Sequence, residues 1–196
     1  MKLTSAIFSI AIFSGLMACT SDPAPTAGEQ HTDTPAEAVA PMTDSARITF
    51  IDKYIRELSQ KNRELESKQY PLNFLSSKDA VLVVRQNGAI VRGGVRLYSD
   101  EMETRSVYHV RDGKLIHVDH REWHKLDDPY AIQYLAFFDD NEKIFKLSKR
   151  IMKLESGEKP GNVVSEPLIE DMANADSLVQ VFKADWERVV KAVEAR

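Results

Sequence analysis

Three turn signals, each set between two apolar runs, constrain this chain more than any other feature of its sequence. Asn87-Gly88, Asp112-Gly113 and the polar run 139–142 each separate two apolar segments. Asn-Gly and Asp-Gly suit hairpin turns because both central positions of such a turn need a positive φ. The flanking apolar segments are 80–84 and 90–98, 106–110 and 115–118, and 134–138 and 144–147. The sequence therefore predicts three hairpins that form a six-stranded antiparallel meander.

Two details of this sheet stay open in the sequence. The apolar residues of 142–154 also recur with a helical period, so this segment can be read as a strand or as the start of a helix. We favour the strand because the turn before it resembles the other two. Gly93 and Gly94 predict a bulge or a sharp bend within their strand, since glycine weakens a regular strand and tolerates unusual dihedral angles.

Two amphipathic helices are expected to flank the sheet. The first is capped at residue 44 or 45 and ends at Tyr70-Pro71, because the residue before a proline is pushed out of the helical region. The second begins near residue 176 and continues toward the end of the chain. Their apolar stripes contain Ile48, Ile51, Ile55, Leu58 and Leu65 in the first helix, and Leu178, Val179, Phe182, Trp186, Val189, Val190 and Val193 in the second. We expect both stripes to pack on the sheet; a coiled-coil partner for the first helix, with Asn62 setting its register, and a membrane surface for the second are the alternatives.

The composition agrees with one ordinary folded domain. The chain has 196 residues, of which 43% are hydrophobic and 29% charged, with 8 Gly and 8 Pro, and this excludes disorder throughout or a collagen-like chain. One cysteine excludes a disulfide scaffold or a zinc finger. The formal net charge of -4 provides no basic surplus for binding nucleic acid. We therefore expect residues 44–196 to form a single α+β domain.

The first 43 residues are not expected to belong to that domain. A positive start at Lys2 and an apolar run through Phe13 are too short to span a membrane and have the layout of a secretory signal. The run ends in Leu16-Met17-Ala18-Cys19, which resembles the lipobox of bacterial lipoproteins. The resemblance implies that 1–18 is a lipoprotein signal peptide and that Cys19 carries diacylglycerol on its sulfur; an ordinary secretory signal is the alternative. Residues 19–43 are rich in proline and alanine and predict a disordered tether.

The same resemblance implies a location in the cell envelope. Acyl chains rather than a transmembrane helix would anchor the protein to the membrane. Thr20, rather than an aspartate, follows the cysteine, and in enterobacterial lipoproteins this favours the outer membrane. The run from Tyr108 to Ile116 is also similar to hairpin repeats of uncharacterised secreted bacterial proteins, a likeness that carries no catalytic motif.

Four of the five histidines fall close together, at His109, His117, His120 and His124, among acidic residues. If the hairpin turn has three residues and a bulge, His109, His117 and Asp119 share one face and can converge on a divalent metal, because imidazole and carboxylate suit zinc, nickel or iron. A two-residue turn shifts the register by one and separates the two histidines. The spacing matches no known ligand motif, so solvated strand histidines are the alternative.

The remaining sequence offers no other catalytic motif and a possible binding face. Nucleophile-elbow, phosphate-loop and calcium-loop patterns are missing from the sequence. Basic residues recur along the predicted strands: Arg85, Arg92, Arg96, Arg105, Arg111, Lys143, Lys146, Lys149, Arg150 and Lys153. They can bind an anionic ligand or a lipid phosphate, or form the ordinary solvated face of a one-sided sheet.

The sequence therefore predicts a lipid-anchored, non-enzymatic binding or envelope-assembly module. Its partners would be the membrane, through the N-terminal lipid, and an envelope protein or a small anionic ligand, without a cofactor. A metal-dependent or acid/base enzyme that uses His109, His117 and Asp119 is the alternative function. The sequence specifies neither the ligand nor the oligomeric state.

Overall fold

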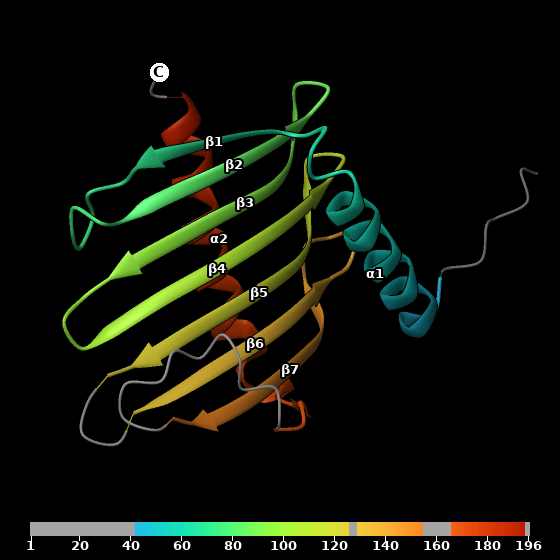
Figure 1. Ribbon diagram of the computed structural model, residues 1–196. Helices are drawn as coiled ribbons and strands as arrows, with labels where there is room; N and C mark the ends of the chain where they lie inside the picture. The colour runs from blue at the N-terminus through green and yellow to red at the C-terminus, as the bar shows by residue number, and fades with distance from the viewer. Residues whose placement is uncertain (1–41, 126–128, 155–165, 195–196) are drawn as a thin grey trace, which may run out of the picture. The chain divides into compact units, whose positions relative to one another are not determined.

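The computed structural model describes residues 42–125, 129–154 and 166–194. The elements are α1 (Asp44–Gln60), β1 (Glu66–Pro71), β2 (Ala80–Gln86), β3 (Ala89–Tyr98), β4 (Met102–Arg111), β5 (Lys114–His124), β6 (Tyr130–Phe138), β7 (Ile144–Lys153), β8 (Ile169–Glu170) and α2 (Ala175–Glu194), with a short 3-10 helix at Met172–Asn174. The eight strands form one antiparallel sheet in which each strand pairs with its neighbours in the sequence (Figure 1). Within the described ranges, no helix has the length and apolar character needed to cross a membrane.

The expected α+β class and the antiparallel sheet are confirmed, but the expected number of strands was wrong. The sheet has eight strands rather than six, because β1 and β8 add one strand at each edge. β1 occupies residues that the sequence assigned to the end of the first helix. Tyr70 explains the difference: it lies opposite Val81 and is 3% exposed in the core, so sheet pairing is favoured over the helical period. Residues 144–153 form β7, so the strand favoured for this segment is confirmed.

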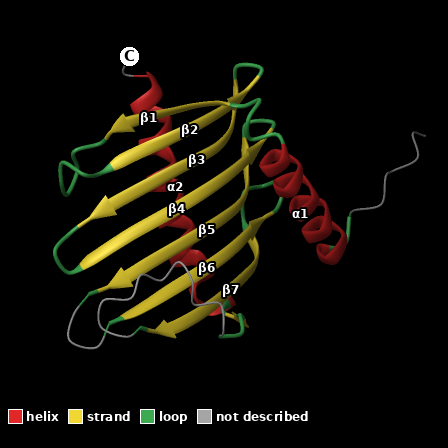
Figure 2. Cartoon of the chain, viewed as in Figure 1, coloured by secondary structure: helices red, strands yellow, loops and turns green. Residues whose placement is uncertain are grey.

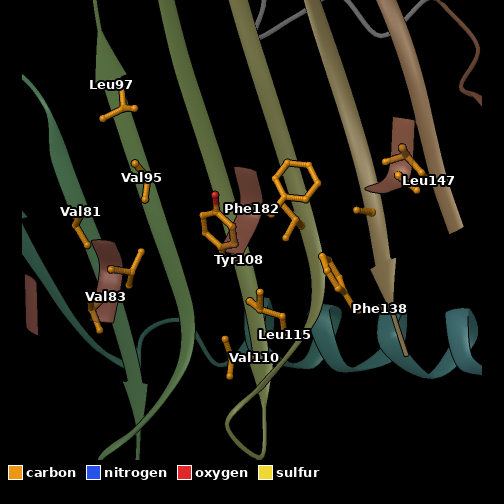
Figure 3. Close-up of a cluster of buried hydrophobic side chains, with 14 of the residues drawn as sticks. Val81, Val83, Val95, Leu97, Tyr108, Val110, Leu115, Phe138, Leu147 and Phe182 are labelled. Carbon is orange, nitrogen blue, oxygen red and sulfur yellow. The ribbon is translucent and has the colours of Figure 1, made fainter. Parts of the chain in front are cut away.

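The main core lies between one face of the sheet and α2. Figure 2 shows α2 crossing behind the strands, and Figure 3 shows the buried side chains that meet there. Phe182 and Val189 of α2 are fully buried against sheet residues such as Tyr108 and Val118. Burying a side chain of this size stabilises the fold by about 1.5–3 kcal/mol, so the apolar stripe expected for this helix secures α2 to the sheet.

α1 contacts the sheet through a smaller cluster. Thr43 caps the helix by accepting a hydrogen bond from the backbone N–H of Ala46, one position before the expected cap. Leu58 is buried with Val84 and Val91, and Leu65 packs beside them from the chain that follows the helix. The hydroxyl of Tyr54 donates to the backbone oxygen of Val110 over 2.8 Å. α1 therefore lies against one end of the sheet, as Figure 1 also shows.

Neither glycine of β3 forms a bulge, and Gly93 serves close packing instead. Both glycines pair in regular register with β2 and β4, and the register shift in this hairpin lies between Val84 and Arg85. A Cβ atom at Gly93 would lie 2.6 Å from a ring carbon of Trp186 and 3.0 Å from a methyl carbon of Val189. Glycine is therefore required here because α2 approaches the strand closely.

We expect Gly93→Ala to lower the free energy of unfolding by about 1–3 kcal/mol, because the added methyl group forces Trp186 or α2 to move. Urea denaturation measures the change. Gly94→Ala is the matched control, since the nearest atom to a Cβ there is the Cβ of Leu82 at 3.4 Å. Equal losses in the two variants would contradict this account of Gly93.

Residues 1–41 lie outside the described residues. They include the predicted signal peptide 1–18, the predicted lipidation site Cys19 and almost all of the predicted tether 19–43. These three interpretations remain predictions from the sequence.

Candidate functional site

The sheet has a second face, opposite to α2, whose residues follow from strand alternation. Tyr108 and Val118 lie in the core under α2, so their neighbours Val107 and Asp119 lie on the second face. Residues directly opposite each other in an antiparallel pair lie on the same face, so they form transverse rows across the strands. Three successive rows are Arg92, His109, His117, Phe137 and Lys146; Gly94, Val107, Asp119, Leu135 and Ser148; and Arg96, Arg105, Arg121, Gln133 and Arg150.

The third of these rows, which we name the arginine row, places arginines of β3, β4 and β5 directly opposite one another. Arg96 donates from Nε to an oxygen of Glu103 over 2.9 Å. Arg121 binds Asp119 with two hydrogen bonds, of 3.1 Å from Nε and 2.8 Å from Nη2. Arg105, between them, is exposed and makes no hydrogen bond or ion pair with another described residue. The central arginine of the row therefore lacks a counter-charge in the described part of the chain.

A series of hydrogen bonds holds the β5, β6 and β7 members of the arginine row (Arg121, Gln133 and Arg150) in place. Arg150 donates from Nε to the side-chain oxygen of Gln133 over 2.7 Å, and Gln133 donates from Nε2 to Asp119 over 2.8 Å. Asp119 in turn accepts both hydrogen bonds of Arg121, and this interaction with the carboxylate raises the pKa of the Arg121 guanidinium. This series of hydrogen bonds connects β5, β6 and β7 and fixes the orientation of the Arg121 guanidinium.

A small pocket opens on the row between β4 and β5. Arg105, Val107, Asp119 and Arg121 line it, and its volume is about 140 Å³. An engineered protein cavity of about 150 Å³ accepts one benzene molecule, so this pocket has room for one small chemical group. Two arginines and one aspartate give its lining a net positive charge.

His109 and His117 lie together in the structure, but the turn and the register that place them there differ from those expected. The turn has two residues, Asp112 and Gly113, both with positive φ, and not the three residues of the turn expected to bring the histidines together. The register nevertheless shifts by one between His109 and Val110, which leaves Ile116 without a direct partner and places His109 opposite His117. The two Nδ1 atoms lie 3.2 Å apart.

Both histidines of this pair are neutral at pH 7. Burial, together with the neighbouring His117 and Arg92, lowers the pKa of His109 to about 3. Burial also lowers the pKa of His117 to about 4, against a weaker opposing effect of Asp119 and Asp52. One imidazole therefore donates its N–H to the other.

Asp119 does not join the two histidines as the third ligand of a metal site. Its carboxylate accepts hydrogen bonds from Arg121 and Gln133, in the next row of the face. Among the residues that the structure describes, no group of three or more histidine, cysteine, aspartate or glutamate side chains is arranged to hold a metal ion.

The other two clustered histidines lie on the opposite face of the sheet, where His120 packs under α2. His120 contacts the Ser106 hydroxyl at 2.8 Å through Nδ1 and Glu122 at 3.1 Å through Nε2, and His124 contacts the same glutamate at 3.3 Å. A serine, a histidine and a carboxylate in this order resemble a hydrolase triad. Ser106 is only 1% exposed and the ring of Phe182 lies 5.4 Å from that of His120, so these two side chains are enclosed in the core, while Glu122 and His124 are partly exposed.

The basic residues that the sequence grouped together have separate roles. Arg92 donates to Asn62 over 2.9 Å, and Arg111 lies 4.3 Å from the ring of Phe50 on α1. Arg96, Arg105 and Arg150 belong to the arginine row. Arg121 and Gln133, which complete the row, were not expected from the sequence. Arg121 follows Asp119 by two positions on one strand, so strand alternation from Asp119 would have placed these two residues on the same face.

Comparisons with protein-family models, with curated proteins and with solved structures gave no match for this chain. The resemblances to bacterial lipoproteins and to secreted hairpin-repeat proteins therefore remain predictions from the sequence.

Proposed function

We propose that this protein is a lipid-anchored module of the cell envelope that binds a small anionic ligand on its arginine row. The observation that supports this proposal is Arg105, an exposed guanidinium that lines a pocket and has no anionic partner among the described residues. Arginine presents a planar fork of donors that matches carboxylate and phosphate oxygens. A pocket built around such a group selects a ligand that brings the missing negative charge.

The charges around Arg105 support the same conclusion. Arg96 and Arg121 lie directly opposite it on the two neighbouring strands, and like charges at such positions destabilise a sheet. Glu103 and Asp119 offset the two outer arginines through hydrogen bonds. The repulsion that remains centres on Arg105, so an anion bound beside it relieves that repulsion and stabilises the folded state.

The lipobox at Leu16-Met17-Ala18-Cys19 supports the anchor. Several acyl chains on one residue hold a protein at a membrane, because each buried CH₂ contributes about 0.8 kcal/mol. A tether of the composition of 19–43 spans roughly 28 Å on average, so the domain would bind its ligand beside the membrane and not within it. The residue after the cysteine favours the outer membrane.

Replacement of the lipidated residue tests the anchor. We expect Cys19→Ser to move the full-length protein from the membrane fraction to the soluble fraction of an expressing bacterium, since no acyl chain can be attached. Cell fractionation and mass spectrometry of the N-terminal peptide measure this. Thr20→Ser, which leaves the cysteine in place, should remain in the membrane fraction. A Cys19→Ser protein that stays fully membrane-bound would contradict the proposed anchor.

Charge reversal tests the binding face. We expect at least one oxyanion among phosphate, sulfate and citrate to raise the melting temperature of the protein at low ionic strength, because binding to the folded state stabilises it. Arg105→Glu should reduce the affinity for that anion by about tenfold or more, since a charge-assisted hydrogen bond is lost and a repulsion is added. Arg63→Glu is the matched control, because Arg63 is exposed and lies before β1, outside the sheet. The proposal fails if no anion binds or if both variants behave alike.

A further inference from the structure

The arginine row also defines which kind of anion it can accept. Resting on the proposed function, we propose that the pocket between β4 and β5 binds a phosphoryl group that carries a proton, as in a phosphate monoester or inorganic phosphate. Arg105 and Arg121 hold its oxygens, and Asp119 accepts the hydrogen bond from its P–OH group.

The two arginines call for a ligand with more than two oxygens. The guanidinium of Arg105 has all its donors free of other described residues, and Arg121 uses only Nε and Nη2 to bind Asp119. The Nη1 group of Arg121 therefore makes no hydrogen bond with another described residue. One carboxylate is satisfied by a single arginine fork, whereas a phosphoryl group has three oxygens that can engage two arginines from opposite strands.

Asp119 adds the requirement for a proton. It lines the pocket, and its oxygens already accept hydrogen bonds from Arg121 Nε, Arg121 Nη2 and Gln133 Nε2. A carboxylate offers about four acceptor sites, so one site is left on Oδ2. An ionised carboxylate repels an anion unless the anion donates a hydrogen bond to it. A phosphate monoester has such a hydrogen in its monoanionic form, because its second pKa is about 6, whereas sulfate and a phosphodiester have none near neutral pH.

The site is ordered before a ligand arrives. The hydrogen bonds from Arg150 to Gln133 and from Gln133 to Asp119 place the acceptor, and the paired hydrogen bonds of Arg121 place the donor. Gln133 is 3% exposed, so its amide is held within the sheet face. A preorganised site loses less conformational entropy on binding. Gln133 and Arg150 are thus positioning residues, while Arg105, Asp119 and Arg121 contact the ligand.

The size of the pocket limits what it can enclose. About 140 Å³ has room for a phosphoryl group and not for the whole of a nucleotide or a sugar phosphate. The remainder of an ester would lie outside, across the sheet face beside Val107. The pocket therefore selects the terminal phosphoryl group and leaves the rest of the ligand open.

Titration of the full-length protein in detergent with four probes tests this assignment. The probes are inorganic phosphate, glycerol 3-phosphate, sulfate, and glycerophosphoglycerol, the soluble phosphodiester headgroup of phosphatidylglycerol. At pH 6 and low ionic strength, isothermal titration calorimetry should show phosphate and glycerol 3-phosphate binding about tenfold or more tightly than sulfate, and the affinity for the ester should fall severalfold at pH 8 as its P–OH proton is lost.

Two variants separate the roles of the contact residues. Arg105→Gln should weaken phosphate binding by about tenfold or more, and Arg63→Gln should leave it unchanged. Asp119→Asn replaces an acceptor by a donor, so it should bring the affinities for phosphate and sulfate close together. Thermal unfolding without ligand establishes that each variant is folded, and Arg105→Lys, which keeps the charge but loses the fork, should retain only part of the affinity.

The outcomes distinguish this inference from the function on which it rests. If sulfate binds as tightly as phosphate to the unmodified protein, or if only the soluble phosphodiester binds, the assignment of a protonated phosphoryl group is overturned while the anion-binding function stands. If neither the four probes nor citrate binds, both are overturned. Loss of phosphate preference in Asp119→Asn together with loss of affinity in Arg105→Gln supports the assignment.

Discussion

Acidification from pH 7.5 to pH 5 is expected to cost the folded domain about 4 kcal/mol, or about 2 kcal/mol for each histidine of the His109–His117 pair. Both imidazoles are buried, each in a residue that is 7% exposed, and burial lowers the pKa of His109 to about 3 and that of His117 to about 4. An unfolded histidine titrates near 6.5. Between these values the unfolded chain binds more protons than the folded one, so stability falls as the pH is lowered through this window.

Urea denaturation at a series of pH values measures this loss. The double variant His109→Gln, His117→Gln keeps two polar side chains that can hydrogen-bond but removes both titrating rings. We expect it to be less stable than the unmodified protein at pH 7.5, because the ring contacts with Phe137 and within the pair are lost. Its stability should change much less between pH 7.5 and pH 5. If the free energy of unfolding depends on pH as steeply in the variant as in the unmodified protein, groups other than His109 and His117 cause the loss of stability.

The centre of the sheet could be predicted from the sequence because turn chemistry is local. Asn87 and Gly88, and Asp112 and Gly113, adopt the positive φ values that two-residue hairpin turns require. In the third turn, the Asp139 side chain accepts hydrogen bonds from the backbone N–H groups of Asn141 and Lys143. Each of these turns is specified by its own residues, so the positions of the three hairpins could be predicted without knowledge of the rest of the chain.

The edges of the sheet could not be predicted in this way. β1 has one buried residue, Tyr70, among exposed positions, so its sequence carries no alternation of apolar and polar residues. β8 has only two residues, Ile169 and Glu170, and both are exposed. Pairing with the neighbouring strand is what makes these segments strands, and that pairing is a property of the assembled fold.

The candidate site depends on register across five strands, which a single sequence does not provide. The contact between His109 and His117 arises from a two-residue turn together with a register shift between His109 and Val110, and this turn without the shift would separate them. The arginine row likewise needs every pairing from β3 to β7 to place its members opposite one another. Residue types could be anticipated, but not which of them would meet.

Among the polar side chains of this domain, we expect Asp79 to contribute most to the free energy of unfolding. It immediately precedes β2 and is 1% exposed. Its Oδ2 accepts hydrogen bonds from the backbone N–H groups of Phe74, Leu75 and Ser76, and its Oδ1 accepts one of 2.8 Å from that of Tyr98. Burial alone would raise the pKa of Asp79, but these four hydrogen bonds outweigh burial and lower it. One carboxylate therefore joins the loop before β2 to the end of β3.

We expect Asp79→Ala to lower the free energy of unfolding by about 3–5 kcal/mol, because it leaves four backbone donors without their acceptor in a protected site. Each unsatisfied donor costs about 1–3 kcal/mol, and hydrogen bonds from water that enters the site offset part of this cost. Asp79→Asn should cost less, since one oxygen remains to accept. Asp100→Ala is the control, because Asp100 is exposed, and it should change stability by no more than about 0.5 kcal/mol. Urea denaturation gives the three values, and faster amide exchange at residues 74–76 and 98 in Asp79→Ala would locate the damage. A loss in Asp79→Ala no larger than that in Asp100→Ala would mean that the loop is held by its apolar neighbours and not by the carboxylate.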